Sequence, residues 1–219
     1  MSLNNMLKKK DYVDVHKLLT PLFIGGLIYY YAAGQQLSAF VILALQGSYA
    51  WLWILRSRVF GYAQLNQPTT LFYGAGIIIF LSGYWLAPYI IISQQIPLTP
   101  ISLAIAMVLY SVGVFILYGT DIQINTALKY SNTLVTDGLV STSRNMNYLG
   151  DLLVYLSFAL LSKSWLPVFF LLFSFCIIWV PAMKRKELIL KEYKNFAEYK
   201  TRSGFFIPCF FKKQKGNLK

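Results

Sequence analysis

Polar side chains gather in one stretch of an otherwise apolar chain, residues 137–151 (DGLVSTSRNMNYLGD). It holds two acids, an arginine, two asparagines, a tyrosine and two glycines, although 57% of the chain is hydrophobic. Packing alone does not call for so many polar groups. The guanidinium of an arginine makes bidentate contacts with phosphate, so Arg144 and, in the basic tail, Arg185 are candidate phosphate ligands. We interpret the stretch as the rim of a buried cofactor pocket.

Asn147 and Asp151 stand four residues apart, so on a helix they share one face. Asp151 falls within an apolar segment, where an ionised side chain is costly and usually faces protein or a polar cavity. This favours a role in the pocket. The alternative is that Asp151 lies at the membrane interface and only complements the dipole at the start of its helix.

The rest of the 219-residue chain consists mostly of apolar segments that would position these groups. Several approach the roughly 20 residues that a helix needs to cross a bilayer. The segments are about 18–33, 37–55, 71–92, 101–118, 146–161 and 165–182. We therefore predict an all-α, polytopic membrane helical bundle of about six transmembrane helices, forming a single integral membrane domain.

The distribution of Lys and Arg predicts the orientation of these helices. Basic residues lie at the N-terminus, in the link around Arg56 and Arg58, in residues 119–146 and in the tail. The links 34–36 and 93–100 carry no charge. Because cytoplasmic loops are enriched in Lys and Arg, both termini and the polar stretch are expected on the cytoplasmic side. Residues 119–146 are too polar to span and are expected to form a loop with short helices.

The same distribution argues against some classes of function. The net charge of +12 comes from the helix flanks, so no nucleic-acid partner is expected. Cys176 and Cys209 are far apart in the predicted topology, and His16, before the first apolar segment, is the only histidine. We therefore expect neither a disulfide nor a metal site.

The polar stretch resembles a signature near the C-terminus of membrane steroid 5α-reductases and sterol reductases. Gly138-Leu139 is followed at 144–151 by RNMNYLGD, similar to R-H/N-x-N-Y-x-G-D/E in those proteins. Asp121 and Gln123 match the D-x-Q that precedes the signature. The resemblance covers about residues 119–211. Residues 47–56 are also similar to a bacterial branch of this superfamily whose activity is poorly defined.

This resemblance implies an NADPH pocket in residues 119–211 that opens to the cytoplasm, with the helices of 17–118 on the side of a lipid substrate. The reaction would be hydride transfer to a carbon–carbon double bond of a steroid-like or isoprenoid lipid, a hydrophobic small molecule. The membrane would be the bacterial inner membrane or the endoplasmic reticulum. The implied cofactor-binding residues are Asp121, Gln123, Arg144, Asn147, Tyr148, Asp151, Arg185 and Tyr193.

Steroid 5α-reductases polarise the substrate ketone with a glutamate–tyrosine pair on their N-terminal helices. The first four apolar segments of this chain contain no glutamate. The nearest substitutes are Gln46, Tyr49, Tyr73 and Tyr84, of which Tyr49 and Tyr84 are the predicted catalytic residues. A tyrosine hydroxyl can donate to a developing enolate. The alternative for any one tyrosine is packing, or a place in an aromatic belt at the membrane interface.

A second family has a similar C-terminal region, the membrane methyltransferases that modify isoprenylcysteine or phospholipids with S-adenosylmethionine. Their pattern is R-H-P-x-Y-x-G, followed by paired glutamates in the last helix. This chain has Asn145 and Met146 at the His and Pro positions, and Glu187 is followed by leucine. The reductase is therefore the favoured reading. The methyltransferase and a non-enzymatic lipid-binding role stay open as alternatives.

Overall fold

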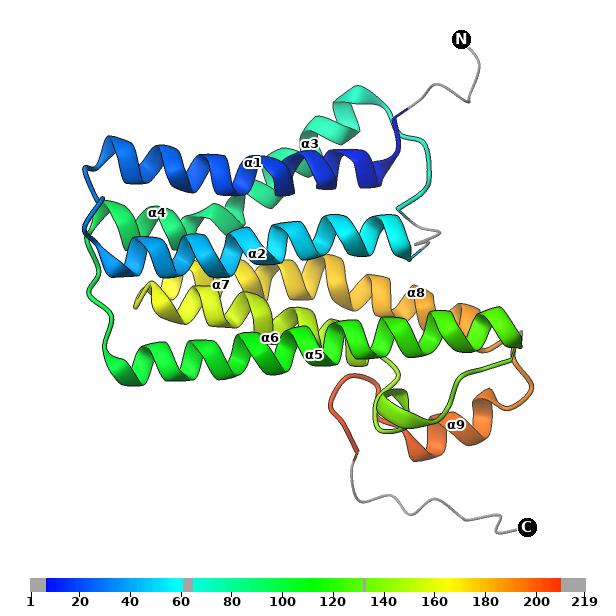
Figure 1. Cartoon of the computed structure of the whole chain (residues 1–219). Coiled ribbons are helices and arrows are strands. Elements are labelled where there is room, and N and C mark those ends of the chain that lie inside the picture. Colours follow the sequence, from blue (N-terminus) through cyan, green and yellow to red (C-terminus); the bar gives the residue numbers. More distant parts are fainter. Residues whose placement is uncertain (1–6, 61–64, 132, 210–219) are drawn as a thin grey trace. The chain divides into compact units, whose positions relative to one another are not determined.

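The computed structural model describes residues 7–60, 65–131 and 133–209 (Figure 1). Their regular secondary structure is helical, and no strand occurs among them beyond two isolated bridges. The predicted all-α class is confirmed. The chain forms two compact units, the first built from residues 1–107 and 156–171 and the second from 108–155 and 172–219.

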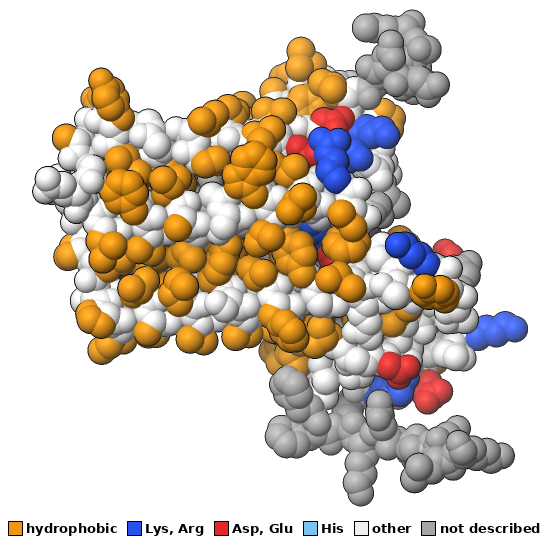
Figure 2. All heavy atoms as spheres, viewed as in Figure 1, with side chains coloured by type: hydrophobic (Ala, Val, Ile, Leu, Met, Phe, Trp, Pro, Cys, Tyr) orange, Lys and Arg blue, Asp and Glu red, His pale blue; other side chains and the backbone are white. Residues whose placement is uncertain are grey.

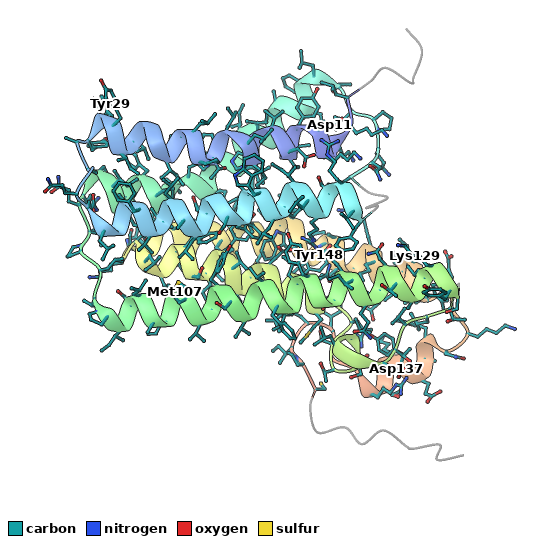
Figure 3. The ribbon with its side chains drawn as sticks, in the orientation of Figure 1. Asp11, Tyr29, Met107, Lys129, Asp137 and Tyr148 are labelled. Atoms are coloured by element: carbon teal, nitrogen blue, oxygen red, sulfur yellow. The ribbon has the colours of Figure 1, made fainter. Side chains whose placement is uncertain are left out.

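The first unit is organised around the helices α1 (Lys9–Tyr30) and α2 (Leu37–Val59). The helix α1 starts where the backbone N–H of Lys8 donates to the Asp11 carboxylate (2.8 Å), which suits the positive end of a helix dipole. It packs against α2, α3 (Leu71–Leu81) and α4 (Leu86–Ser93). Asp11 and Tyr29 mark its two ends in Figure 3.

The third apolar segment is not one regular helix. A 3-10 turn, η2 (Ser82–Trp85), separates α3 from α4. Gly83 lies in this turn against the ring of Phe170, in a position where a β-carbon would overlap the ring. The turn thus allows the close approach of α7 (Trp165–Ser174), the helix that carries Phe170.

Two predicted boundaries are wrong, both in the same way. The helix α5 runs from Pro100 to Tyr130, whereas residues from 119 on were expected to form a loop with short helices. The last apolar segment likewise continues through a π-helical turn, η4 (Phe175–Trp179), into α8 (Val180–Leu190). Polarity ends the apolar stretch, but the backbone hydrogen bonds of a helix continue until a residue or turn interrupts them. Asp121 and Gln123 therefore lie on a helix.

The second unit contains α5 from Val108 on, the 3-10 turn η3 (Gly138–Ser141), the helix α6 (Met146–Leu161) as far as Tyr155, α8 and α9 (Phe196–Arg202). The helix α6 has the bounds predicted from sequence. Its Gly150 lies against the backbone of α5 at Gly113 and Leu117. Small residues at a crossing allow two helices to approach closely, and here they place the polar start of α6 beside α5.

In the part of the chain that the structure describes, four helices are long and apolar enough to cross a membrane: Leu37–Val59, Leu71–Ser93, Pro100–Tyr130 and Trp165–Leu190. The apolar helix α6 is shorter, and α1 carries Asp14 and Lys17 in its first half. Figure 2 shows apolar side chains along the helices and charged ones mainly near helix ends. Large apolar residues such as Phe72 (92% exposed) have no protein cover. These features indicate an integral membrane protein; six spans and cytoplasmic termini remain predictions.

Candidate cofactor site

Asn147, Tyr148 and Asp151 occupy the first turns of α6, as predicted. All three are half-buried, so none lies on a bare outer surface. The turn is fixed at its start, because the carbonyl of Asn145 accepts from the backbone N–H groups of Tyr148 (3.0 Å) and Leu149 (3.3 Å). Asn147 and Asp151 share one face of the helix. The ring centroid of Tyr148, a residue labelled in Figure 3, lies 6.4 Å from that of Trp179.

Lys186 of α8 lies beside Asn147, although it was not predicted from the sequence as a site residue. Its ammonium group donates to the carbonyl oxygen of Arg144 (2.8 Å) and to Oδ1 of Asn147 (3.4 Å). The carboxylate of Asp121, a buried residue of α5, attracts this ammonium group. Three segments far apart in sequence thus bring an amide, a carboxylate and a cation together.

Arg185, the predicted phosphate ligand beside Lys186, is exposed. The signal that separates the two residues is helical periodicity. Met183 is fully buried, and residues three and four positions later share its face once the helix is known to continue to Leu190. Lys186 and Glu187 therefore face the interior of the unit. The sequence analysis ended the segment at residue 182, so it did not predict this orientation.

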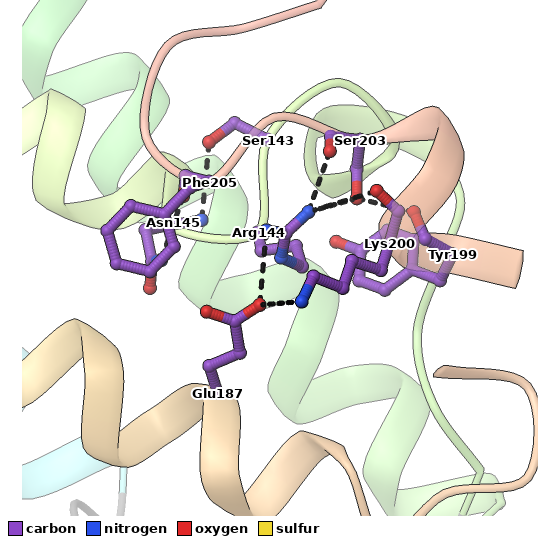
Figure 4. Close-up of polar contacts among 8 residues, drawn as sticks. All are labelled: Ser143, Arg144, Asn145, Glu187, Tyr199, Lys200, Ser203 and Phe205. Atoms are coloured by element: carbon purple, nitrogen blue, oxygen red, sulfur yellow. Dashed lines mark hydrogen bonds and ion pairs between the residues drawn. The ribbon is translucent and has the colours of Figure 1, made fainter. Parts of the chain in front are cut away.

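Arg144 makes its hydrogen bonds to the C-terminal region of the chain (Figure 4). Its guanidinium donates to the carbonyl oxygen of Ser203 (2.7 Å), to Ser203 Oγ (3.1 Å) and to the carbonyl oxygen of Lys200 (3.4 Å). It also pairs with Glu187 of α8 at 3.2 Å, and its side chain is only 5% exposed. Arg144 thereby holds α9 against the segment that leads into α6.

The neighbours of Arg144 have the same kind of partner. Asn145 Nδ2 donates to the carbonyl oxygen of Phe205 (2.8 Å), and Ser143 Oγ donates to that of Phe206 (2.9 Å). The backbone N–H of Arg144 donates to the carbonyl oxygen of Gly204 (3.0 Å). The first part of the polar stretch therefore fixes the chain that follows α9, and the second part carries the group around Asn147.

Tyr199 of α9 completes this connection. Its hydroxyl donates to the carbonyl oxygen of Val140 (2.7 Å), and the side chain is 2% exposed. Burial raises the pKa of Tyr199 to about 12, because the phenolate would lose its hydration, although the positive charge of Arg144 acts in the opposite direction. Tyr199 is neutral at physiological pH and acts as a hydrogen-bond donor.

Gln123, a predicted cofactor ligand, holds the loop that opens the polar stretch. Its Oε1 accepts from the backbone N–H of Leu139 (3.0 Å), and its amide nitrogen donates to the carbonyl oxygen of Asp137. Gly138 between them has a φ of +62°, a conformation that side chains rarely adopt. The loop and Gln123 therefore fit each other. Tyr193, also predicted, is half-buried in the turn after α8.

The predicted catalytic tyrosines belong to the first unit. Tyr49 is 2% exposed, and its ring centroid lies 6.1 Å from that of Phe158. Tyr84 of η2 packs edge to face on Phe170 (5.1 Å). The amide nitrogen of Gln46 donates to the backbone carbonyl of Tyr84 (3.2 Å). The first unit thus places the buried amide of Gln46 beside Tyr84. The sequence pointed to both residues as substitutes for the missing glutamate, but not to their contact.

Comparison with known proteins assigns the chain to a family. The family model described as 3-oxo-5-alpha-steroid 4-dehydrogenase matches residues 66–211, which include the whole polar stretch and α8 and α9. The chain belongs to this family. The resemblance read from the sequence is thereby confirmed, and a membrane oxidoreductase of the steroid-reductase kind is supported. No curated protein matches the chain significantly. Nothing in these findings favours the methyltransferase alternative.

Proposed function

We propose that the protein is a membrane-embedded, NADPH-dependent reductase of a carbon–carbon double bond in a steroid-like or isoprenoid lipid. The observation that carries the proposal is the polar group of the second unit. In it the ammonium nitrogen of Lys186 lies 3.4 Å from Oδ1 of Asn147, and the Asp121 carboxylate attracts the same ammonium group. Such groups are costly in an apolar protein and mark functional sites. The family match supports a reductase as the function that this group serves.

The donor set suits a nicotinamide dinucleotide. Lys186 supplies a positive charge for a phosphate group, and the side chains of Asn147 and Asp151 offer partners for the amide or ribose of the cofactor. Asp121 is a second carboxylate that would accept hydrogen bonds from ribose hydroxyls, and Tyr148 would line the nicotinamide ring of the cofactor. The cofactor supplies the hydride, while the protein aligns it and provides a proton.

The remaining predicted ligands serve this site in two ways. Gln123 and Arg144 shape its walls through their hydrogen bonds to the 137–139 loop and to α9. Arg185 and Tyr193 are proposed to meet the outer part of the cofactor, since Arg185 is exposed and Tyr193 half-buried. In the first unit, Tyr49 and Tyr84 are proposed to donate a hydrogen bond to an oxygen of the lipid substrate.

The proposal is tested by titrating the purified protein in detergent with NADPH and, separately, with S-adenosylmethionine. Saturable binding of NADPH is expected. Asp151→Ala and Asn147→Ala should each weaken it at least tenfold, or about 1.4 kcal/mol. Binding of S-adenosylmethionine alone would make the protein a methyltransferase. If a folded protein binds neither compound, the enzyme assignment fails. Where NADPH does bind, lipid profiling of a deletion strain would identify the substrate.

A further inference from the structure

Gln46 is a buried amide near the middle of an apolar helix. It lies on α2, one of the candidate membrane spans, and is 5% exposed. A polar side chain at that depth is costly, and such residues commonly mark functional sites. The partners of its two polar atoms therefore indicate what this part of the first unit can recognise.

The orientation of the Gln46 amide follows from its one printed partner in the fold. Its nitrogen lies 3.2 Å from the backbone carbonyl oxygen of Tyr84. A carbonyl oxygen only accepts hydrogen bonds, so the NH₂ group must be the end that faces Tyr84. The amide oxygen, Oε1, is buried and accepts no hydrogen bond from any described residue. The atom of Gln46 that lacks a partner is therefore an acceptor.

His16 of α1 supplies a donor in the same region. Its ring stacks on that of Trp85 with 4.8 Å between the centroids, and the residue is 1% exposed. The carbonyl of Leu81 is close enough to influence the ring, yet neither ring nitrogen forms a hydrogen bond of normal geometry with a described residue. An imidazole carries at least one N–H. A buried donor at His16 therefore lacks a partner.

Gln46 and His16 flank the same short turn, η2. Gln46 bonds to Tyr84 of this turn, and His16 stacks on the next residue. The two helices are close at this level, since a β-carbon on Gly47 would lie 3.8 Å from Cβ of Pro21. The first unit thus brings an unpaired acceptor and an unpaired donor to one place. Buried polar groups normally have a hydrogen-bond partner, so this place suits a bound polar group.

We propose that Gln46 and His16 bind the hydroxyl group of the lipid substrate, which is then a lipid alcohol. A hydroxyl both donates and accepts. Its O–H would donate to Oε1 of Gln46, and its oxygen would accept from the N–H of His16. A ketone or an ether cannot donate and would leave Oε1 of Gln46 unpaired, which is unfavourable in a buried site. The inference rests on the proposed function, since it names the substrate class of that enzyme.

Three isoprenoids test it on the purified full-length protein in a neutral maltoside detergent: farnesol, farnesyl methyl ether and the ketone geranylacetone. Farnesol should bind saturably and at least tenfold more tightly than the other two. Gln46→Met removes the amide at similar length, so it should weaken farnesol at least tenfold and change the ether less than twofold. His16→Phe keeps a ring against Trp85 and should weaken farnesol at least threefold. Gln94→Met, at an exposed glutamine of the same unit, is the control and should change the farnesol affinity less than twofold.

Ether or ketone binding as tight as that of farnesol would overturn the proposal and leave only a bound water as the partner of Gln46. Farnesol binding that Gln46→Met does not weaken would overturn it as well. If that variant does not fold, the comparison of the three ligands on the unmodified protein still decides. None of these measurements involves NADPH. A protein that prefers farnesol but does not bind NADPH keeps the hydroxyl site and loses the reductase assignment, whereas NADPH binding without a preference for farnesol overturns this inference alone.

Discussion

Gly113 and Gly150 meet backbone to backbone where α5 packs against α6. A β-carbon added to Gly150 would lie 2.7 Å from the carbonyl oxygen of Gly113 and 2.7 Å from the backbone nitrogen of Leu117. Neither backbone atom can move aside by rotating a side chain. The contact fixes the start of α6, and with it Asn147 and Asp151, relative to Asp121 on α5.

Gly150→Ala should therefore destabilise the protein by about 1–3 kcal/mol, the usual cost of overpacking. It should also weaken NADPH binding, because α6 has to shift. Thermal unfolding in detergent and a cofactor titration measure the two effects. Gly76→Ala is the matched control, since a β-carbon there meets nothing within 4 Å. A Gly150→Ala protein as stable as the control would contradict the close contact.

Lys186→Met should weaken NADPH binding at least tenfold, because it removes the cation that lies beside Asn147 and Asp121. Lys184→Met, two residues away on the exposed side of α8, is the control and should change the affinity less than twofold. Isothermal titration in detergent measures both. Equal effects of the two substitutions would mean that only the overall charge of α8 matters, and Lys186 would leave the site.

Arg144→Met should release the chain from 196 to 209, since it removes three hydrogen bonds to Ser203 and Lys200 and leaves Glu187 without this partner. Removing one member of a buried ion pair costs about 3–5 kcal/mol. Hydrogen exchange should show faster exchange at residues 199–205. The double variant Arg144→Met with Glu187→Met should recover part of the stability. Unchanged exchange in the single variant would show that α9 is held by other contacts.

Tyr199→Phe tests the response to alkaline pH. The pKa of Tyr199 is raised to about 12 in the folded protein, against about 10 for a free tyrosine. A raised pKa means that the unfolded chain loses its proton first, so stability falls as the pH rises from about 10 to about 12. The variant should show a smaller loss over this range, seen by denaturant unfolding at several pH values. The same slope in both proteins would remove Tyr199 as the cause.

Local patterns were sufficient for much of the structure. Apolar length predicted the all-α membrane class and the bounds of α6, because both depend on neighbours along the chain. Spacing placed Asn147 and Asp151 on one helical face. Hydropathy did not predict where α5 and α8 end, because these helices extend beyond their apolar stretches to Tyr130 and Leu190. A helix ends where its backbone bonding ends, and the polarity of its side chains does not decide that point.

The amino-acid sequence by itself determined the family, the membrane character and the polar stretch in which the proposed site lies. The tertiary structure decided which polar residues lie together around Asn147 and which hold distant parts of the chain together. Arg144 looks from sequence like a phosphate ligand, yet its donors reach Ser203, 59 residues further along. Lys186 looks like one of several basic residues, yet it bonds to Asn147. Such pairings depend on how distant segments pack, which local sequence patterns do not encode.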